Sequence, residues 1–268
     1  MSLVYSTEMT KPLLNHRIDG NGPNVVLLHP IGLDFACWDD VVKLLAGRYR
    51  VLRVDLSGHG ASPPAASGGT LADYAEDVHA LLAHLRHTPT AVVGLSFGGM
   101  ITQALALAHP EDVSALVICG CPCTLPDAGR QMMAERVASA ESDGMAPAIE
   151  TTLERWFTKD FMAKGGGEPT RRRLLADDPN EWARGWRAIA QLDTAPRLNE
   201  IKVPTLCIAG ELDPASPPAA LGEIAKRIEG AQLAVLPGAP HMMQIERPKE
   251  FAATVGAFLD SALANTKR

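Results

Sequence analysis

The chain has 268 residues, a formal net charge of −6 at pH 7 and a hydrophobic share of 46%. This length suffices for one large α/β domain, or for a core domain that carries an insertion, with no need of disulfides to stabilise it. The charge is spread without long runs of one sign, so nucleic acid is not an expected partner, and the arginines at 171–173 fit a solvated helix face.

The beginning of the chain gives no targeting signal. Residues 1–8 lack the basic start and the apolar run of a secretory signal, and no segment reaches the roughly 18 apolar residues of a membrane span. We therefore expect a cytoplasmic protein without a membrane partner.

The cysteines predict reduced thiols. Their number is odd, and three of them alternate along one strand end, which favours buried thiols over a disulfide framework. The segment 119–123 lacks the C-x₂-C pairing of a zinc site, so we expect neither a metal nor a cofactor. The five are Cys37, Cys119, Cys121, Cys123 and Cys207.

The first part of the chain alternates strands and helices. Residues 25–28 form a short apolar run that opens into the loop 29–32, which indicates a buried strand. Apolar residues at helical spacing over 38–46 predict a helix, and 51–56 predict the next strand. After the turn-rich segment 57–64, Thr70 and Asp73 form a capping box that begins another helix.

Residues 90–100 read as a buried strand, a sharp turn and a helix. Val92 and Val93 precede the turn, and Ser96 lies on it between Gly94 and Gly98. This G-x-S-x-G pattern is the nucleophile elbow, in which a side chain at either glycine would collide as the strand reverses into the helix. The sequence therefore predicts a serine whose hydroxyl is held out over the end of a sheet.

The second half contains a long helical region between strands. A strand at 115–119 is followed by helical patterning over 127–192, which we interpret as a cap over the core. Strands resume at 205–209 and 233–236, separated by a helix over 218–228 and followed by a helix over 248–263. The alternation predicts a mostly parallel sheet with helices on both faces.

Polar residues directly after the strands are the candidate catalytic groups, because ligands bind beyond the carboxyl ends of such strands. Ser96, Asp213 and His241 each follow a predicted strand. His241 would take the serine proton and later deliver it to the leaving alcohol, and Asp213 would orient the imidazole. Glu211 and Asp127 are alternatives for the acid.

Negative charge on a tetrahedral intermediate needs backbone N–H donors. Phe97, directly after the nucleophile, would supply one donor. The loop 29–32 would supply the other from Ile31, since Pro30 has no N–H. His29 either holds the shape of this loop, the role we favour, or touches the substrate.

These motifs together resemble the α/β-hydrolase family over nearly the whole chain. The resemblance covers residues 29–32 and 55–62, the elbow at 94–98, Asp213 and His241. Within the family the chain is most similar to the 3-oxoadipate enol-lactonase-like group, through residues 155–158 and 245–248. It implies a core domain of residues 1–123 and 196–268, with a helical cap of residues 124–195 inserted after the sixth strand.

The expected substrate is a small carboxylic ester or lactone. The candidate pocket residues are mostly apolar, and Arg155 could pair with a substrate carboxylate or face solvent. The alternatives are 3-oxoadipate enol-lactonase proper, other lactones such as acyl-homoserine lactones, and a ligand-binding protein without catalysis; a perhydrolase side activity is also possible. The candidate substrate contacts are His29, Met100, Arg155, Trp156, Phe157 and Met242.

Overall fold

The computed structural model describes residues 13–64 and 69–264. Residues 1–8, in which we expected no targeting signal, lie outside the described residues. Within the described ranges, no helix combines the length and the apolar character that crossing a bilayer would require.

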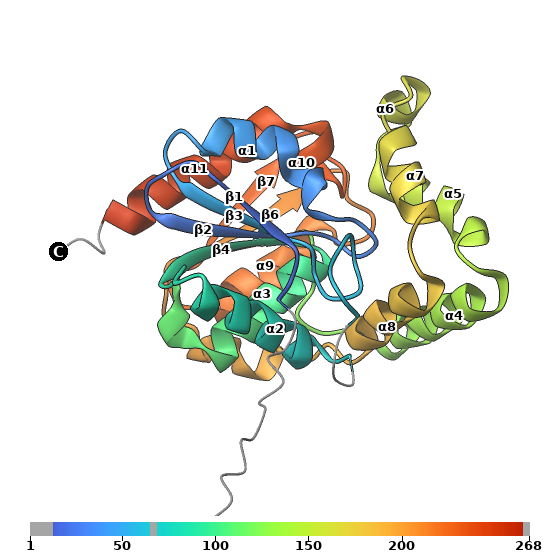
Figure 1. Cartoon of the computed structure of the whole chain (residues 1–268), viewed down its shortest axis with the longest axis horizontal. Coiled ribbons are helices and arrows are strands. Elements are labelled where there is room, and N and C mark those ends of the chain that lie inside the picture. The colour runs from blue at the N-terminus through green and yellow to red at the C-terminus, as the bar shows by residue number, and fades with distance from the viewer. Residues whose placement is uncertain (1–12, 65–68, 265–268) are drawn as a thin grey trace, which may run out of the picture.

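A single seven-stranded sheet forms the centre of the molecule (Figure 1). Its spatial order is β1-β3-β2-β4-β5-β6-β7, with β1 antiparallel to β3 and every other pairing parallel. The expected mostly parallel α/β sheet is thereby confirmed. The strands are β1 (His16–Asp19), β2 (Asn24–Leu28), β3 (Arg50–Val54), β4 (Thr90–Leu95), β5 (Val113–Cys119), β6 (Thr205–Gly210) and β7 (Gln232–Leu236).

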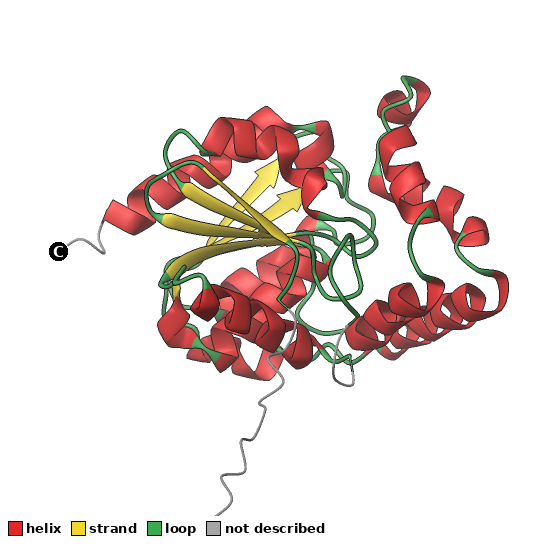
Figure 2. Ribbon diagram, in the orientation of Figure 1, coloured by secondary structure: helices red, strands yellow, loops and turns green. Residues whose placement is uncertain are grey.

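Helices cover both faces of the sheet, as Figure 2 shows. α1 (Asp39–Leu45) and α11 (Pro248–Ala264) pack together on one face, while α2 (Leu71–His84), α3 (Phe97–Ala108) and α9 (Pro218–Arg227) lie on the other. The short helices are η1 (Phe35–Trp38), η2 (Pro110–Asp112), η3 (Ala195–Glu200) and α10 (Met243–Glu246). Because both faces are covered, every residue of β4 and of β6 is buried.

Residues 124–195, called the helical segment below, stand to one side of the sheet (Figure 1). An isolated bridge between Thr124 and Asp193 joins the two ends of the segment. Five described strands precede it, one fewer than the six we counted on. Its helices are α4 (Asp127–Asp143), α5 (Ala146–Trp156), α6 (Lys159–Ala163), α7 (Glu168–Leu175) and α8 (Pro179–Ala190), and α4 packs along α8.

The structure can be compared with the sequence at several local features. The capping box is confirmed, since Thr70 Oγ1 accepts the Asp73 N–H at 3.2 Å and Asp73 Oδ2 accepts the Thr70 N–H at 2.8 Å. β1 was not predicted, because its four residues are only partly buried and carry no apolar run. The five cysteines are free, and burial raises the pKa of Cys119 and Cys121 well above that of an exposed thiol.

Candidate active site

Ser96 occupies a strained turn between β4 and α3. Its backbone has φ 56° and ψ −114°, a conformation that costs an L-residue about 1 to 3 kcal/mol. A Cβ at Gly94 or Gly98 would come within 3.0 Å of a backbone carbonyl, at Gly98 and at Leu28 respectively. Both glycines are therefore required for the reversal, as the elbow pattern predicts.

Backbone hydrogen bonds hold this turn on both sides. The Ser96 N–H donates to the carbonyl of Cys119 at the end of β5, at 2.9 Å. The Gly98 N–H donates to the carbonyl of His29 in the loop after β2, at 3.2 Å. The half-buried Ser96 side chain is thus fixed relative to the two strands that flank β4.

His241 and Asp213 form a buried pair. His241 Nδ1 lies 2.7 Å from Asp213 Oδ2, and the two side chains are 3% and 0% exposed. The other carboxylate oxygen, Oδ1, accepts the N–H groups of Ala215 and Ser216 at 2.8 and 2.9 Å. With Nδ1 engaged, Nε2 is the ring nitrogen left to act on another group, and both His241 and Ser96 line the same pocket.

The two alternative acids lie in other settings. Glu211 Oε2 accepts the Gly238 N–H at 2.7 Å and so closes the turn after β7. Asp127 is exposed at the start of α4. Of the three carboxylates we considered, Asp213 is the one bonded to His241.

Two backbone amides are available near Ser96. Phe97 begins α3, so its N–H has no acceptor within the helix. Ile31 lies in the loop after β2 and lines the same pocket as Ser96. Within the described part of the chain, neither N–H donates to a turn or loop carbonyl.

His29 holds the loop after β2 from within the core. Its side chain is fully buried, Nδ1 lies 2.7 Å from the Pro30 carbonyl, and Nε2 accepts the Leu56 N–H at 2.9 Å. Burial lowers the pKa of His29 to about 4, so the ring is neutral and donates through Nδ1 while it accepts through Nε2. Both nitrogens are thus engaged, and the ring is absent from the pocket wall.

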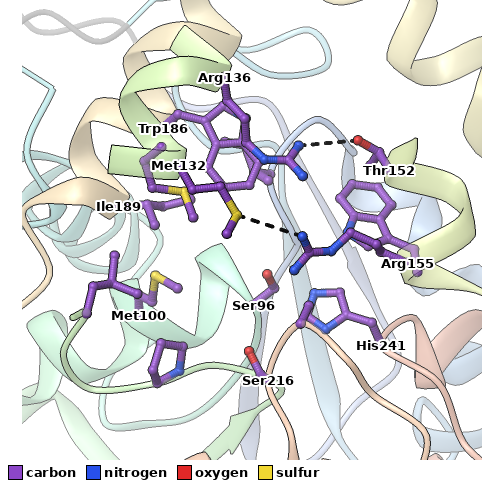
Figure 3. Close-up of a pocket in the computed structure, with 16 residues that line it drawn as sticks. Ser96, Met100, Met132, Arg136, Thr152, Arg155, Trp186, Ile189, Ser216 and His241 are labelled. Atoms are coloured by element: carbon purple, nitrogen blue, oxygen red, sulfur yellow. Dashed lines mark hydrogen bonds between the residues drawn. The ribbon is translucent and has the colours of Figure 1, made fainter. Parts of the chain in front are cut away.

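The pocket above Ser96 lies between the core and the helical segment (Figure 3). Met100, Arg155 and Trp156 line it as expected, whereas His29, Phe157 and Met242 do not. Phe157 stacks instead on Phe161, with ring centroids 5.1 Å apart, and Met242 is fully buried. A larger cavity of about 480 Å³ exists between η1 and α7, but neither Ser96 nor His241 lines it.

Several residues of α4 and α8 that line the pocket were not predicted from the sequence. Arg136 lies over the Trp186 ring at 4.9 Å, and its Nη1 is 3.5 Å from Thr152 Oγ1. Arg155 Nη1 donates to Met132 Sδ at 3.8 Å (Figure 3). For Met132 and Arg136, helical spacing alone gave no signal, because α4 has no clear apolar face that would show which residues point inward.

No described residue at this pocket suggests a metal. Elsewhere, His79, His109 and Asp112 offer ligand atoms within 4.8 Å of one another. The two rings are stacked, with centroids 3.7 Å apart and planes 2° apart, so their nitrogen lone pairs lie in separate parallel planes and do not converge on one ion. Their nitrogens already bond Asp112 and Glu76.

Comparison with known proteins finds consistent similarities. Residues 23–248 match the model of the alpha/beta hydrolase fold family. The chain is 31% identical to a pimeloyl-[acyl-carrier protein] methyl ester esterase of Aeromonas hydrophila, over 90% of this chain and 96% of the relative. It is 29% identical to 3-oxoadipate enol-lactonase 1 of Acinetobacter baylyi, over 97% and 99%. The crystal structure of the enol-lactonase from Burkholderia xenovorans LB400 is similar, with a TM-score of 0.87 at 33% identity, over 92% of this chain and 96% of that one.

The low pKa of His29 predicts that the folded protein loses stability at acid pH. Because burial favours the neutral ring, the stability it contributes is fully present above pH 6.5 and is lost as the pH falls towards 4, at up to about 1.4 kcal/mol per pH unit. His29→Gln can keep both hydrogen bonds but cannot titrate. Urea unfolding between pH 4 and 6.5 should therefore show a shallower loss in this variant than in the wild type. His84→Gln, at an exposed position of α2, is the control, and equal slopes for wild type and His29→Gln would contradict the prediction.

Proposed function

The chain belongs to the alpha/beta hydrolase fold family, and on that premise we propose that it is a serine hydrolase that cleaves a carboxylic ester or lactone. The observation that carries the proposal is the buried His241–Asp213 pair, 2.7 Å apart, whose histidine lines the same pocket as the strained Ser96. The similarity to an esterase and to enol-lactonases supports the same reaction class.

The proposed reaction has two steps. In the first, Ser96 Oγ attacks the substrate carbonyl while His241 Nε2 takes the hydroxyl proton, and that proton then leaves with the alcohol. In the second, His241 takes a proton from water as the water oxygen attacks the acyl-enzyme carbonyl. The bond to Ser96 Oγ then breaks, His241 returns the proton to that oxygen, and the carboxylic acid leaves. Asp213 stabilises the imidazolium in both steps, because its carboxylate lies against Nδ1. A lactone would give a single hydroxy acid.

The amides of Ile31 and Phe97 would stabilise the oxyanion in each step. Such donors act on charge that develops in the transition state, and removal of one donor costs about 2.7 to 4 kcal/mol in comparable sites. The Ile31 amide belongs to the loop after β2 and the Phe97 amide to the elbow after β4, and these two strands are neighbours in the sheet. Their alignment therefore depends on the register of those two strands.

We propose that residues 124–195 act as the cap that covers the pocket. This segment provides Arg136, Arg155, Trp156 and Trp186 to the pocket wall. The Trp156 carbonyl also accepts the Met242 N–H at 3.0 Å, which ties the segment to the turn that carries His241. The reaction as written needs no cofactor and no metal.

A substrate that carries its own carboxylate is the second candidate. Arg136 and Arg155 both line the pocket, and within the described ranges neither forms an ion pair with an acid. Burial and the charge of Arg155 lower the pKa of Arg136, so a bound anion would relieve the repulsion between the two groups. This arrangement favours an acidic ester or lactone over a neutral one.

A ligand-binding protein without catalysis is less consistent with the site. The backbone at Ser96 is strained, and strained residues of this kind cluster at functional sites, where the strain is part of the mechanism. A binding protein has no chemical need to place a buried His–Asp pair beside that serine. Turnover by the wild type and by Ser96→Ala separates these two possibilities.

Ser96→Ala should abolish ester hydrolysis without loss of the fold, because the hydroxyl forms the acyl-enzyme. In a comparable serine hydrolase the loss in kcat is on the order of 10⁶. Steady-state turnover of p-nitrophenyl acetate and of a γ-lactone, with melting temperature as the fold control, makes the test. A variant that keeps more than a tenth of wild-type turnover would rule out Ser96 as the nucleophile.

Asp213→Asn should be strongly impaired, with kcat reduced by about 10⁴, since the imidazole loses its charged partner and its correct tautomer. Glu211→Gln is the matched control. Glu211 also follows β6, but its carboxylate accepts the Gly238 N–H and is not bonded to His241. The same ester assay applies. Near-normal turnover of Asp213→Asn together with an inactive Glu211→Gln would move the acid to Glu211.

Arg155→Ala and Arg136→Ala should reduce kcat/KM for a carboxylate-bearing lactone and leave a neutral ester nearly unchanged. A hydrogen bond to a charged group contributes about 1.5 to 3 kcal/mol, which corresponds to roughly 10- to 150-fold. Arg187→Ala, on α8 but paired with Glu141, is the control. Equal losses on both substrates would mean that these arginines only support the pocket wall.

A further inference from the structure

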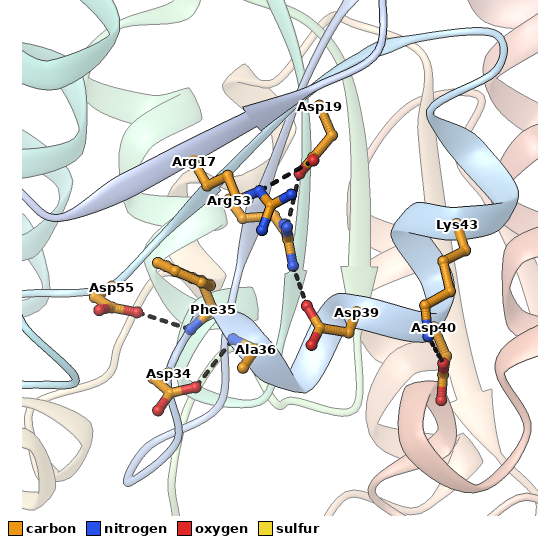
Figure 4. A network of polar contacts seen from close by, with 10 residues as sticks. All are labelled: Arg17, Asp19, Asp34, Phe35, Ala36, Asp39, Asp40, Lys43, Arg53 and Asp55. Carbon is orange, nitrogen blue, oxygen red and sulfur yellow. Dashed lines mark hydrogen bonds and ion pairs between the residues drawn. The ribbon is translucent and has the colours of Figure 1, made fainter.

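The loop that carries Ile31 is held from the core side by fixed hydrogen bonds. The Phe35 N–H donates to Asp55 Oδ1 at 2.8 Å, and Asp34 Oδ1 accepts the Ala36 N–H at 2.9 Å (Figure 4). The same Asp55 accepts the Ala61 N–H through its other oxygen at 2.9 Å. Asp34 thus has one oxygen engaged in capping η1 and a second that faces away from this network.

The helical segment packs on the same loop without spare room. A Cβ at Gly32, which has φ 73°, would lie 2.6 Å from Leu174 Cδ2 and would also clash with the Trp182 ring. A Cβ at Gly185 of α8 would lie 2.9 Å from Ile31 Cδ1. A shift of α7 or α8 would therefore be transmitted directly to Ile31 and Gly32.

Arg173 joins the two sides of this contact. Its Nε lies 2.9 Å from Asp34 Oδ2, an ion pair without hydrogen-bond geometry, and its Nη2 donates to Asp177 Oδ1 at 2.6 Å. The Arg173 and Asp177 side chains are 20% and 4% exposed. Solvent screens such a pair less than it screens a surface ion pair.

Charge explains why the arginine is needed there. Burial raises the pKa of Asp177 to about 7, while Arg173 lowers it and the nearby Asp34 and Asp178 raise it further. Burial likewise raises the pKa of Asp34. The charge of Arg173 lowers this pKa, and the charge of Asp55 raises it. Without the guanidinium, the pKa of both carboxyl groups would rise further, Asp34 and Asp177 would lose the cation that lies between them, and the loop would lose its tie to α7.

We propose that Arg173 is a positioning residue for catalysis: by pairing with Asp34 and Asp177, it fixes α7 against the loop after β2 and so sets the direction of the Ile31 N–H. This inference rests on the proposed function, because it assigns Arg173 an effect on the oxyanion donor. Arg173 itself does not line the pocket at Ser96. Its effect should therefore appear in the transition state and not in substrate binding.

The test compares Arg173→Met, Arg173→Lys and the control Arg172→Met, which changes an exposed arginine one position away. With p-nitrophenyl acetate, Arg173→Met should lower kcat about 10- to 100-fold and change KM less than threefold. The loss in kcat should be smaller than the roughly 10²- to 10³-fold cost of removing an oxyanion donor, because the Ile31 N–H is misaligned and not removed. Arg173→Lys should recover part of kcat, because it restores the charge. Arg172→Met should match the wild type.

A double-mutant cycle with Asp34→Asn tests whether the ion pair is the route. If Arg173 acts through Asp34, Arg173→Met combined with Asp34→Asn should lose little more kcat than the worse single variant. Melting temperatures confirm that each variant is folded. Losses that multiply, a rise in KM alone, or an unchanged kcat in folded Arg173→Met would each overturn the inference.

The two proposals fail in different ways. If Ser96→Ala is inactive and Arg173→Met keeps full kcat, the serine mechanism stands and the positioning role of Arg173 is wrong. If the wild type turns over no ester or lactone, both are wrong.

Discussion

The reversal of the chain at Ser96 is the constraint on which the rest of the site depends. It is possible only because Gly94 and Gly98 have no side chain, since a Cβ at either position would come within 3.0 Å of a backbone carbonyl. The strain at Ser96 is balanced by hydrogen bonds from the elbow to Cys119 and His29, at the ends of the two neighbouring strands. The serine is therefore positioned by the sheet as a whole and not by its own turn alone.

Parallel strand order explains how distant residues meet. β4, β5, β6 and β7 are neighbours in the sheet, and their carboxyl ends lie on one edge, so the residues after β4, β6 and β7 approach one another. Burial then gives the His241–Asp213 bond its strength, because water does not compete for a pair that is 3% and 0% exposed. In our proposal, the same edge receives the oxyanion amides from the loops after β2 and β4.

The helical segment forms the other wall of the pocket and adds positive charge to it. The core side of the pocket contributes the chemistry that we propose, and α4, α5 and α8 contribute a wall with aromatic rings and two arginines. At its other end, the segment rests on the loop after β2 through Leu174, Trp182 and the Arg173 ion pairs. We propose that one segment thus affects both substrate choice and the geometry of the reacting group.

Local patterns in the sequence were enough to predict the sheet apart from β1, the elbow, and Ser96 and His241 as candidate catalytic residues. These patterns are buried apolar runs, glycines on either side of a sharp turn, and polar residues after strands. The sequence left Asp213, Glu211 and Asp127 open, and only the tertiary structure shows which of them is bonded to His241. Of the six candidate substrate contacts, Met100, Arg155 and Trp156 line the pocket, whereas His29, Phe157 and Met242 contact other neighbours. Arg136 lines the pocket but was not predicted. Which face of a helix meets a pocket depends on how helices pack across the chain, and so do long-range ion pairs such as Arg173–Asp34; spacing along the sequence does not contain that information.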